Sequence, residues 1–255
     1  MSGRKVSRRK LITTGLAAAA GVAGLGVADR LAHRYGLIPP DAEGFYGPSN
    51  TLTYAAQRIL QLHHPLAREF DRSQISKGVI PVKGQVPASE SYRRMLRDGF
   101  ADWRLSVDGL VARPRSFSLA ELRQFPSCHQ ITLHACEQGW SFIAEWTGVQ
   151  LSYILNLVGI RPQAKYVAIF SYDKVWDTMD MFDAWHPQTL LAYGMNGQEL
   201  PAPHGAPVRV RVARQVGYKN VKFLSHLIVT DNAKQYGKGL GGKAPEAGWA
   251  WYGGI

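Results

Sequence analysis

The chain has 255 residues, 45% of them hydrophobic, and seven tryptophans, so disorder is excluded and one large or two small domains are possible. The net charge is +11, but five basic residues fall within the first ten positions, and without them the charge is +6, too little for a nucleic-acid-binding protein. The two cysteines exclude a disulfide framework, and they form no Cys-x-x-Cys motif of the kind that binds zinc or attaches haem.

Residues 1–28 have the pattern of an export signal. Arg8 and Arg9 form a twin-arginine pair, and an Ala/Gly-rich apolar stretch follows to Ala28. The alternative is a transmembrane helix, which the Ala, Gly and Thr content disfavours. The pattern predicts passage through the twin-arginine export machinery to the periplasm or another extracytoplasmic location, with retention at the membrane if the signal is not cleaved. That pathway exports folded proteins, often with a cofactor already bound.

Residues 29–100 are expected to lead into the main domain. A Pro/Gly-punctuated linker covers 29–50, and apolar residues at helical spacing between 52 and 60 predict a short helix. His63 and His64 end this helix. Side chains at adjacent positions of a helix point in different directions, so the two histidines are interpreted as a surface pair at the helix end rather than as metal ligands. Few periodic signals follow, and 71–100 is predicted to be rich in loops.

From residue 103 the pattern is typical of short strands joined by turns, and it predicts one α+β domain at 101–255 with mainly antiparallel strands. Ser118 and Glu121 form a capping box that opens a short helix. Asn196-Gly197 is a strong hairpin-turn signal. Further elements are expected as strands at 103–108, 130–136, 166–170, 208–212 and 223–229, a helix at 151–158, and an aromatic, Gly-rich cover at 237–255.

Cys136 is the most informative single residue, because the strand at 130–136 delivers it onto a Gly-Trp-Ser turn. Strand alternation places Thr132, His134 and Cys136 on one face. From residue types alone, three roles stay open for Cys136, in this order: an inert buried thiol, a metal ligand, and a nucleophile with His134 as its base. Cys128 is interpreted as inert.

A second cluster is basic. Arg209 and Arg211 share one face of the strand at 208–212, and Arg214 and the glycine turn at 217–222 follow. Guanidinium, ammonium and backbone N–H groups together suit a phosphate or pyrophosphate-like anion. The alternative is a solvated strand face. The nucleotide motifs Gly-x-Gly-x-x-Gly and Walker A are absent, so nucleotide binding by those motifs is disfavoured.

Four separated blocks together resemble the molybdopterin-binding domain of the sulfite-oxidase-like oxidoreductases, a family that includes periplasmic methionine-sulfoxide reductases. The blocks occur in the family's order across roughly residues 100–230, and they are 102–110, the Cys136 segment, 186–193, and 204–209 with 217–222. The resemblance implies a sulfite-oxidase molybdopterin-domain-like fold and the molybdenum–molybdopterin cofactor. It also implies that Cys136 is the single protein thiolate on molybdenum. By the same resemblance, His204 and Arg209 contact the pterin and its phosphate, and Asn220, Val221 and Lys222 contact the phosphate end. Ser171 lies near a further cofactor-contacting position of the family.

The chain departs from the family at two places. The family commonly reads Cys-Val-Glu-Gly-Trp-Ser, whereas here Cys136 is followed by Glu137 and Gln138, so the carboxylate has moved by one position. The family's amino-terminal cofactor-contacting loop has only Lys83-Gly84 as a candidate counterpart.

The sequence therefore predicts an exported molybdenum oxidoreductase that transfers an oxygen atom on a small sulfur–oxygen substrate, by sulfite oxidation or sulfoxide reduction. Because neither a carboxyl-terminal dimerisation domain nor a haem motif is found, a monomer is expected, with a separate electron-transfer partner such as a membrane haem protein or a cytochrome. Two alternatives stay open: a cofactor-binding protein without turnover of its own, and a thiol hydrolase that uses Cys136 and His134.

Overall fold

The computed structural model describes residues 36–61, 66–78 and 86–255, together with positions 30, 32, 80 and 82. The predicted export signal, the His63-His64 pair and the Lys83-Gly84 candidate lie outside the described residues. Across the described ranges, no helix has the length and apolar character needed to cross a membrane.

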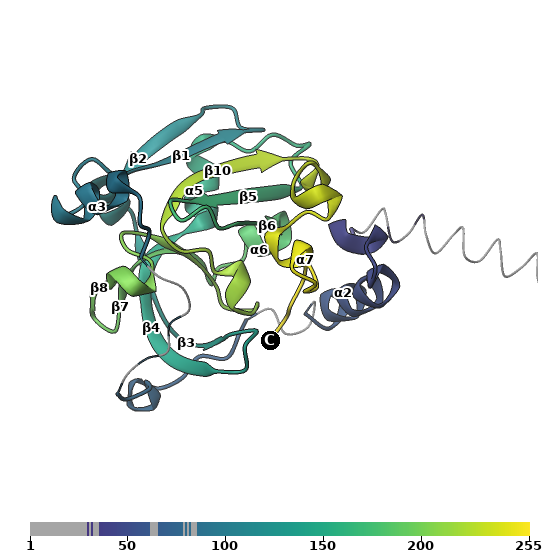
Figure 1. Ribbon diagram of the computed structural model, residues 1–255, viewed down its shortest axis with the longest axis horizontal. Coiled ribbons are helices and arrows are strands. Elements are labelled where there is room, and N and C mark those ends of the chain that lie inside the picture. The colour runs from purple at the N-terminus through teal and green to yellow at the C-terminus, as the bar shows by residue number, and fades with distance from the viewer. Residues whose placement is uncertain are drawn as a thin grey trace, which may run out of the picture.

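The strands of the described chain form two sheets that face each other across the main core (Figure 1). The strands are β1 Arg104–Gly109, β2 Arg115–Ser118, β3 Ser127–Ala135, β4 Ser141–Gln150, β5 Tyr166–Ser171, β6 Trp176–Asp180, β7 Thr189–Met195, β8 Gln198–Glu199, β9 Arg209–Val212 and β10 Leu224–Thr230. The helices are α2 Gly47–Gln61, α3 Glu90–Arg97, α4 Leu119–Gln124, α5 Leu151–Val158, α6 Met181–Ala184 and α7 Lys243–Glu246.

One sheet has the order β2-β1-β10-β5-β6, and the other has the order β3-β4-β7-β8 with β9 also paired to β7. Within these sheets β1 and β10 run parallel and the other pairs are antiparallel, so the predicted α+β class with mainly antiparallel strands is confirmed. Strand β4 curves strongly around one side of the molecule (Figure 1). At Gly148 a Cβ atom would lie 2.3 Å from the Leu191 carbonyl oxygen, so only glycine allows β4 to approach β7 this closely.

The main core is built from inward-facing side chains of both sheets and from α3 and α5. Trp103, Leu105 and Phe117 are fully buried there, and the Trp103 indole donates a hydrogen bond of 2.8 Å to the Leu224 carbonyl oxygen. Burial of each large apolar side chain contributes about 1.5–3 kcal/mol. This core holds the ends of β3, β5, β6 and β9 in fixed positions, and the chemistry-bearing residues lie at those ends.

Local signals in the sequence predicted several elements correctly. Ser118 and Glu121 form the expected capping box at α4. Asn196 and Gly197 have φ angles of 52° and 76°, as a tight hairpin turn of the primed type requires. The expected strands and the helix at 151–158 are also present, and the tail packs as an irregular cover with Trp251 fully buried.

Helix α3 was not predicted, because it lies in the region expected to be rich in loops. Ser89 caps it by accepting a hydrogen bond of 3.4 Å from the Tyr92 backbone N–H. Only Tyr92 and Met95 are buried, and arginines occupy several of the other positions. Two apolar residues spaced by one helical turn are too few to reveal the periodicity of a helix in the sequence.

Candidate active site

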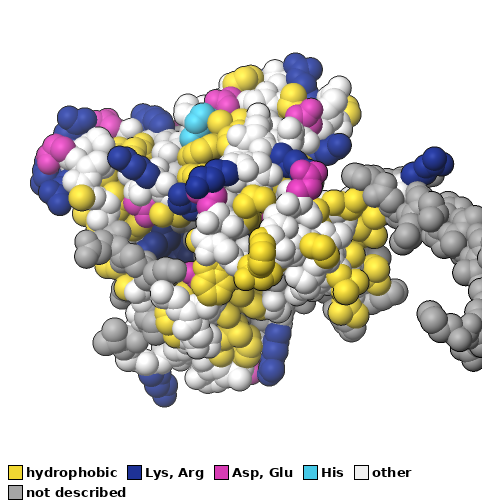
Figure 2. Space-filling view, turned by 45° about the vertical axis from the view of Figure 1, so that its right-hand side comes forward, with side chains coloured by type: hydrophobic (Ala, Val, Ile, Leu, Met, Phe, Trp, Pro, Cys, Tyr) yellow, Lys and Arg dark blue, Asp and Glu magenta, His cyan; other side chains and the backbone are white. Residues whose placement is uncertain are grey.

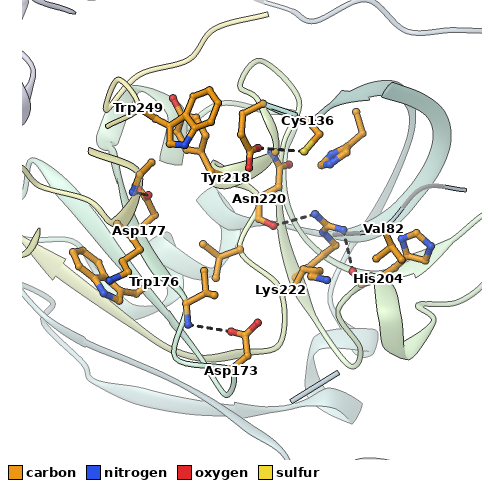
Figure 3. A pocket seen from close by; sticks show the side chains of 18 of the residues that line it. Val82, Cys136, Asp173, Trp176, Asp177, His204, Tyr218, Asn220, Lys222 and Trp249 are labelled. Atoms are coloured by element: carbon orange, nitrogen blue, oxygen red, sulfur yellow. Dashed lines mark hydrogen bonds between the residues drawn. The ribbon is translucent and has the colours of Figure 1, made fainter. Parts of the chain in front are cut away.

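A cavity of about 300 Å³ opens where the end of β3, the β5–β6 turn, the 217–222 loop and the tail meet (Figure 3). The structure brings six of the predicted site residues together on its wall: Cys136, His204, Arg209, Asn220, Val221 and Lys222. Ser171 does not line it. Its hydroxyl hydrogen-bonds to the Asp173 carboxylate, and Asp173 does lie on the wall, so Ser171 shapes the β5–β6 turn instead.

Cys136 is held in a tight turn at the end of β3. Its backbone N–H donates to the Trp140 carbonyl oxygen at 2.9 Å, and its own carbonyl oxygen accepts from Gly139 at 3.0 Å. The thiol is 7% exposed and donates to Glu137 Oε2 at 3.4 Å. A Cβ atom at Gly217 would lie 3.2 Å from that carboxylate oxygen, so the glycine brings the 217–222 loop close to Cys136. Cys128, by contrast, packs against a second hydrophobic cluster and does not itself line the cavity.

The inward face of β3 is polar. Gln130, Thr132 and His134 are buried, whereas the apolar residues that alternate with them are partly exposed. The reason is Arg211, whose guanidinium donates to Thr132 Oγ1 at 3.1 Å and to the Leu133 carbonyl oxygen at 2.6 Å. A buried cation needs such acceptors, so the strand that carries Cys136 is fastened to β9 through Arg211.

His134 lies on the cavity wall as a neutral imidazole. Burial, reinforced by Arg209 and Arg211, holds the pKa of His134 well below its ordinary value of 6.5. Its Nδ1 atom has no hydrogen-bond partner among the described residues, and its ring packs 5.0 Å from the Phe142 ring. A catalytic base in a thiol hydrolase needs a third group to orient it. Asp183 cannot serve, because Arg58 and Arg214 already engage its carboxylate.

Arg209 and Arg211 are 4% and 0% exposed, so the solvated-face interpretation of the basic strand was wrong. Arg209 donates to the carbonyl oxygens of His204 at 2.9 Å and Asn220 at 3.0 Å, and its Nε atom has no partner in the described part of the chain. Burial lowers the pKa of each guanidinium to about 9. No described carboxylate pairs with Arg209, so this buried charge is suited to an anionic ligand.

Asn220 and Val221 shape the loop rather than present free functional groups. Asn220 Oδ1 accepts from Arg211 Nη1 at 2.9 Å and from the Val212 backbone N–H at 2.8 Å. Its amide donates to two further backbone carbonyls in the same loop. Val221 packs into the main core. The two residues therefore set the position of Lys222, which follows them.

Lys222 and His204 lie beside Arg209. The Lys222 ammonium donates to the Pro203 carbonyl oxygen at 2.9 Å, and burial and Arg209 together lower the pKa of Lys222 to about 8 despite Asp173. Burial, Arg209 and Lys222 lower the pKa of His204 to about 4. At neutral pH, Lys222 is thus a cation and His204 is a neutral hydrogen-bonding group.

The low pKa of Lys222 predicts a pH-dependent anion site. In cofactor-free protein, the affinity for sulfate, whose own charge is constant in this range, is expected to fall as pH rises through about 8, because Lys222 loses its proton there. Lys222→Gln is expected to bind sulfate more weakly at neutral pH and to lose the decline around pH 8. Isothermal titration calorimetry between pH 6 and about 9 measures this, and a pH-independent wild-type affinity would contradict it.

Sequence reasoning missed several residues of the wall. Trp176 and Trp249 line the cavity, and they come from β6 and the tail. No motif marks them, because isolated aromatic residues are more often part of a core. Because these residues are far apart along the chain, the sequence does not show that they lie close together in the fold.

The Cys136 thiol, the buried Arg209 guanidinium and the partly buried Lys222 ammonium share one cavity wall, and this combination suits an anionic cofactor that carries a thiophilic metal. Residues 92–237 match the family described as the oxidoreductase molybdopterin binding domain, and the chain belongs to this family. The predicted family and the oxidoreductase class are therefore confirmed.

Three relatives illustrate the similarity. Over 154 residues the chain is 40% identical to a putative protein-methionine-sulfoxide reductase subunit YedZ1 of Azospira oryzae, covering 60% of this chain and 56% of that protein. It is 32% identical to the protein-methionine-sulfoxide reductase catalytic subunit MsrP of Ralstonia nicotianae, over 51% of this chain and 44% of that one. The solved sulfane dehydrogenase SoxCD of Paracoccus pantotrophus matches with a TM-score of 0.50 at 26% identity, over 52% of this chain and 39% of that one. The chain thus spans about half the length of the curated relatives it matches.

The residues present fit the cofactor that the family implies. A soft metal favours a thiolate ligand, and the Cys136 thiol lies on the cavity wall. Among the described residues, the buried Nε atom of Arg209 and the buried Nδ1 atom of His134 have no hydrogen-bond partner. A ligand in the cavity could supply these missing hydrogen bonds. No cluster of three or more His, Cys, Asp or Glu suited to a metal exists in the described chain, and a single-thiolate centre does not require one.

Proposed function

We propose that this protein is an exported molybdenum oxidoreductase that transfers an oxygen atom from a sulfur compound, with Cys136 as the only protein thiolate on the metal. When bound, molybdopterin supplies a metal that changes oxidation state by two electrons and exchanges an oxygen atom. The observation that carries the proposal is that the Cys136 thiol and the Arg209 guanidinium, whose described hydrogen bonds go only to backbone carbonyl oxygens, line one cavity.

Each residue of the wall has a task in this proposal. The turn at Cys136 fixes the sulfur atom, and Arg209, Lys222 and His204 hold the pterin and phosphate end of the cofactor by charge and hydrogen bonds. Asn220 and Val221 keep Lys222 in place. The aromatic rings around His134 exclude water, which strengthens every electrostatic contact inside the cavity.

Sulfoxide reduction is the favoured direction, because the two curated relatives described above are named as a putative subunit and a catalytic subunit of protein-methionine-sulfoxide reductases. In that reaction the sulfur–oxygen bond breaks, two electrons and two protons are consumed, and a sulfide and water are released. The electrons come from a separate partner, a membrane haem protein or a cytochrome. The twin-arginine pattern supports export to the periplasm, and a monomer is part of the proposal.

A cofactor-binding protein without turnover is the alternative that the altered Glu137-Gln138 order raised. The geometry favours turnover. Gln138 is exposed and does not line the cavity, whereas Glu137 lies on the wall with its carboxylate 3.4 Å from Cys136 Sγ. The carboxylate has moved by one position in the sequence, but it remains beside the proposed metal ligand.

Assays with artificial electron carriers test the direction. With a reduced viologen as donor, methionine sulfoxide reduction is expected to exceed sulfite oxidation with ferricyanide by about 100-fold or more in kcat/KM. Sulfite oxidation at an equal or greater kcat/KM would contradict the proposed direction. Full molybdenum content with neither reaction would favour the cofactor-binding alternative.

A further inference from the structure

We infer that Trp249 contacts the substrate and determines specificity, by receiving the apolar part of a sulfoxide at the mouth of the cavity together with Val175 and Trp176. The identity of the substrate rests on the proposed function. The residue itself does not follow from the family, because the family match ends at residue 237 and Trp249 lies in the tail beyond it.

The cavity has two ends of different character. Figure 3 shows Trp249 and Trp176 on one side, and Cys136 and His204 on the other. The second side is the cation-rich end proposed to hold the cofactor. A substrate that approaches that end from the first side would pass the two indole rings.

The backbone around Trp249 is fixed from both sides. Before it, the Ala244 N–H donates to Asp177 Oδ2 at 3.2 Å; after it, the Ala250 carbonyl oxygen accepts from the Tyr218 hydroxyl at 2.7 Å. Trp251, fully buried, donates from its indole to Thr178 Oγ1 at 2.8 Å. Asp177 and Tyr218 both line the cavity. These hydrogen bonds fix the backbone of the tail on both sides of Trp249 and therefore fix the position of Trp249 at the cavity.

The Trp249 side chain itself stays 46% exposed although its backbone is fixed. Hydrophobic side chains gather in the middle of the face shown in Figure 2. Among the large hydrophobic residues that are exposed in the described chain, only Val82, Val175 and Trp249 also line the cavity. An aromatic ring held half-exposed at a cavity gains contact area when a ligand arrives, and sulfur packs favourably against aromatic rings.

The charged groups near this mouth are already engaged, and the Asp173 carboxylate accepts hydrogen bonds from the Ser171 hydroxyl and the Val175 backbone N–H. Lys243 donates to Glu246 at 2.8 Å within α7, and Asp177 accepts from the buried Lys219 ammonium at 2.5 Å. A mouth with an open indole and engaged charged groups suits a neutral, apolar group, such as the side chain of methionine sulfoxide, better than a small dianion such as sulfite.

Substitutions of Trp249 in the holoenzyme test this role. Trp249→Ala is expected to lower kcat/KM for amide-capped methionine sulfoxide about tenfold, mainly through KM, and Trp249→Phe is expected to keep most of the wild-type value. Dimethyl sulfoxide lacks the longer apolar part that the indole is inferred to receive, so its kcat/KM is expected to change less than about twofold. Trp185→Ala is the matched control, because Trp185 is also partly exposed (39%) but does not line the cavity.

Equilibrium binding of the corresponding methionine sulfone, which is not reduced, separates this inference from the proposed function. If sulfone binding depends on Trp249 but no sulfoxide is turned over, the binding role stands and the proposed reaction fails. Equal sulfone affinity in wild type and Trp249→Ala, or no sulfone binding by wild type, would overturn the inference. So would equal losses in Trp249→Ala for methionine sulfoxide and dimethyl sulfoxide at unchanged molybdenum content.

Discussion

Replacing Cys136 by serine is expected to reduce sulfoxide reduction by more than about 100-fold, because changes to groups that only support a metal ligand already cost roughly 10- to 100-fold. Serine is nearly the same size but offers a hard oxygen in place of a soft thiolate. The fold is expected to persist, since Cys136 lies in a turn whose hydrogen bonds are made by its backbone. Steady-state kinetics with a reduced viologen, normalised to folded protein, measure the effect.

Cys128→Ser is the control for this substitution, because Cys128 lies outside the cavity. It is expected to retain wild-type turnover and molybdenum content. If Cys136→Ser kept most of the activity with full molybdenum, Cys136 would not be the ligand. If alkylation inactivated a molybdenum-free but active protein, the thiol hydrolase alternative would return.

Replacing Asp183 by alanine is expected to lower the free energy of unfolding by about 3–5 kcal/mol, the usual cost of breaking a buried ion pair by removing one partner. Asp183 is fully buried and accepts from Arg58 at 3.2 Å and Arg214 at 2.5 Å. This cluster fastens α2 to the domain, since Arg58 lies on α2. Urea denaturation followed by circular dichroism measures the loss.

Glu199→Gln is the matched control for Asp183→Ala. It breaks the pair between Arg123 and Glu199, whose side chains are 41% and 81% exposed, and the expected loss is within about 1 kcal/mol. An equal loss from both substitutions would contradict the assigned role of the buried cluster.

The Asp183 cluster also predicts acid sensitivity. Burial opposes ionisation, but Arg58 and Arg214 more than offset it and hold the pKa of Asp183 below its ordinary value of 3.8. Because the folded-state pKa is the lower one, this stabilisation is complete above the ordinary pKa and is lost as pH falls through the folded value. Asp183→Asn should therefore be less sensitive to acid than the wild type.

Much of the fold could be predicted from the sequence, because its elements carry strong local signals. The alternation at 103–108, the capping box at Ser118 and the Asn196-Gly197 turn each depend on a few neighbouring residues. Helix α3 has only Tyr92 and Met95 on its buried face, so its period was too short to recognise. The burial of the polar face of β3 depends on Arg211 from another strand, which no local pattern reveals.

The candidate site was predictable where family motifs mark it. The Cys136 segment and the blocks at 204–209 and 217–222 identified cavity residues correctly by position. Their tasks differ once contacts are known: Asn220 is bonded to Arg211 and Val212 of β9, and Ser171 orients a turn. Trp176 and Trp249 could not be found, since aromatic residues so far apart in the chain give no shared signal before folding.

Elemental analysis of the purified wild-type protein tests the central claim most directly. We expect about one molybdenum per chain, bound through Cys136 as a single thiolate. Cys136→Ser should lose most of this metal while Cys128→Ser retains it. A folded, active wild-type protein that contains no molybdenum would contradict the claim.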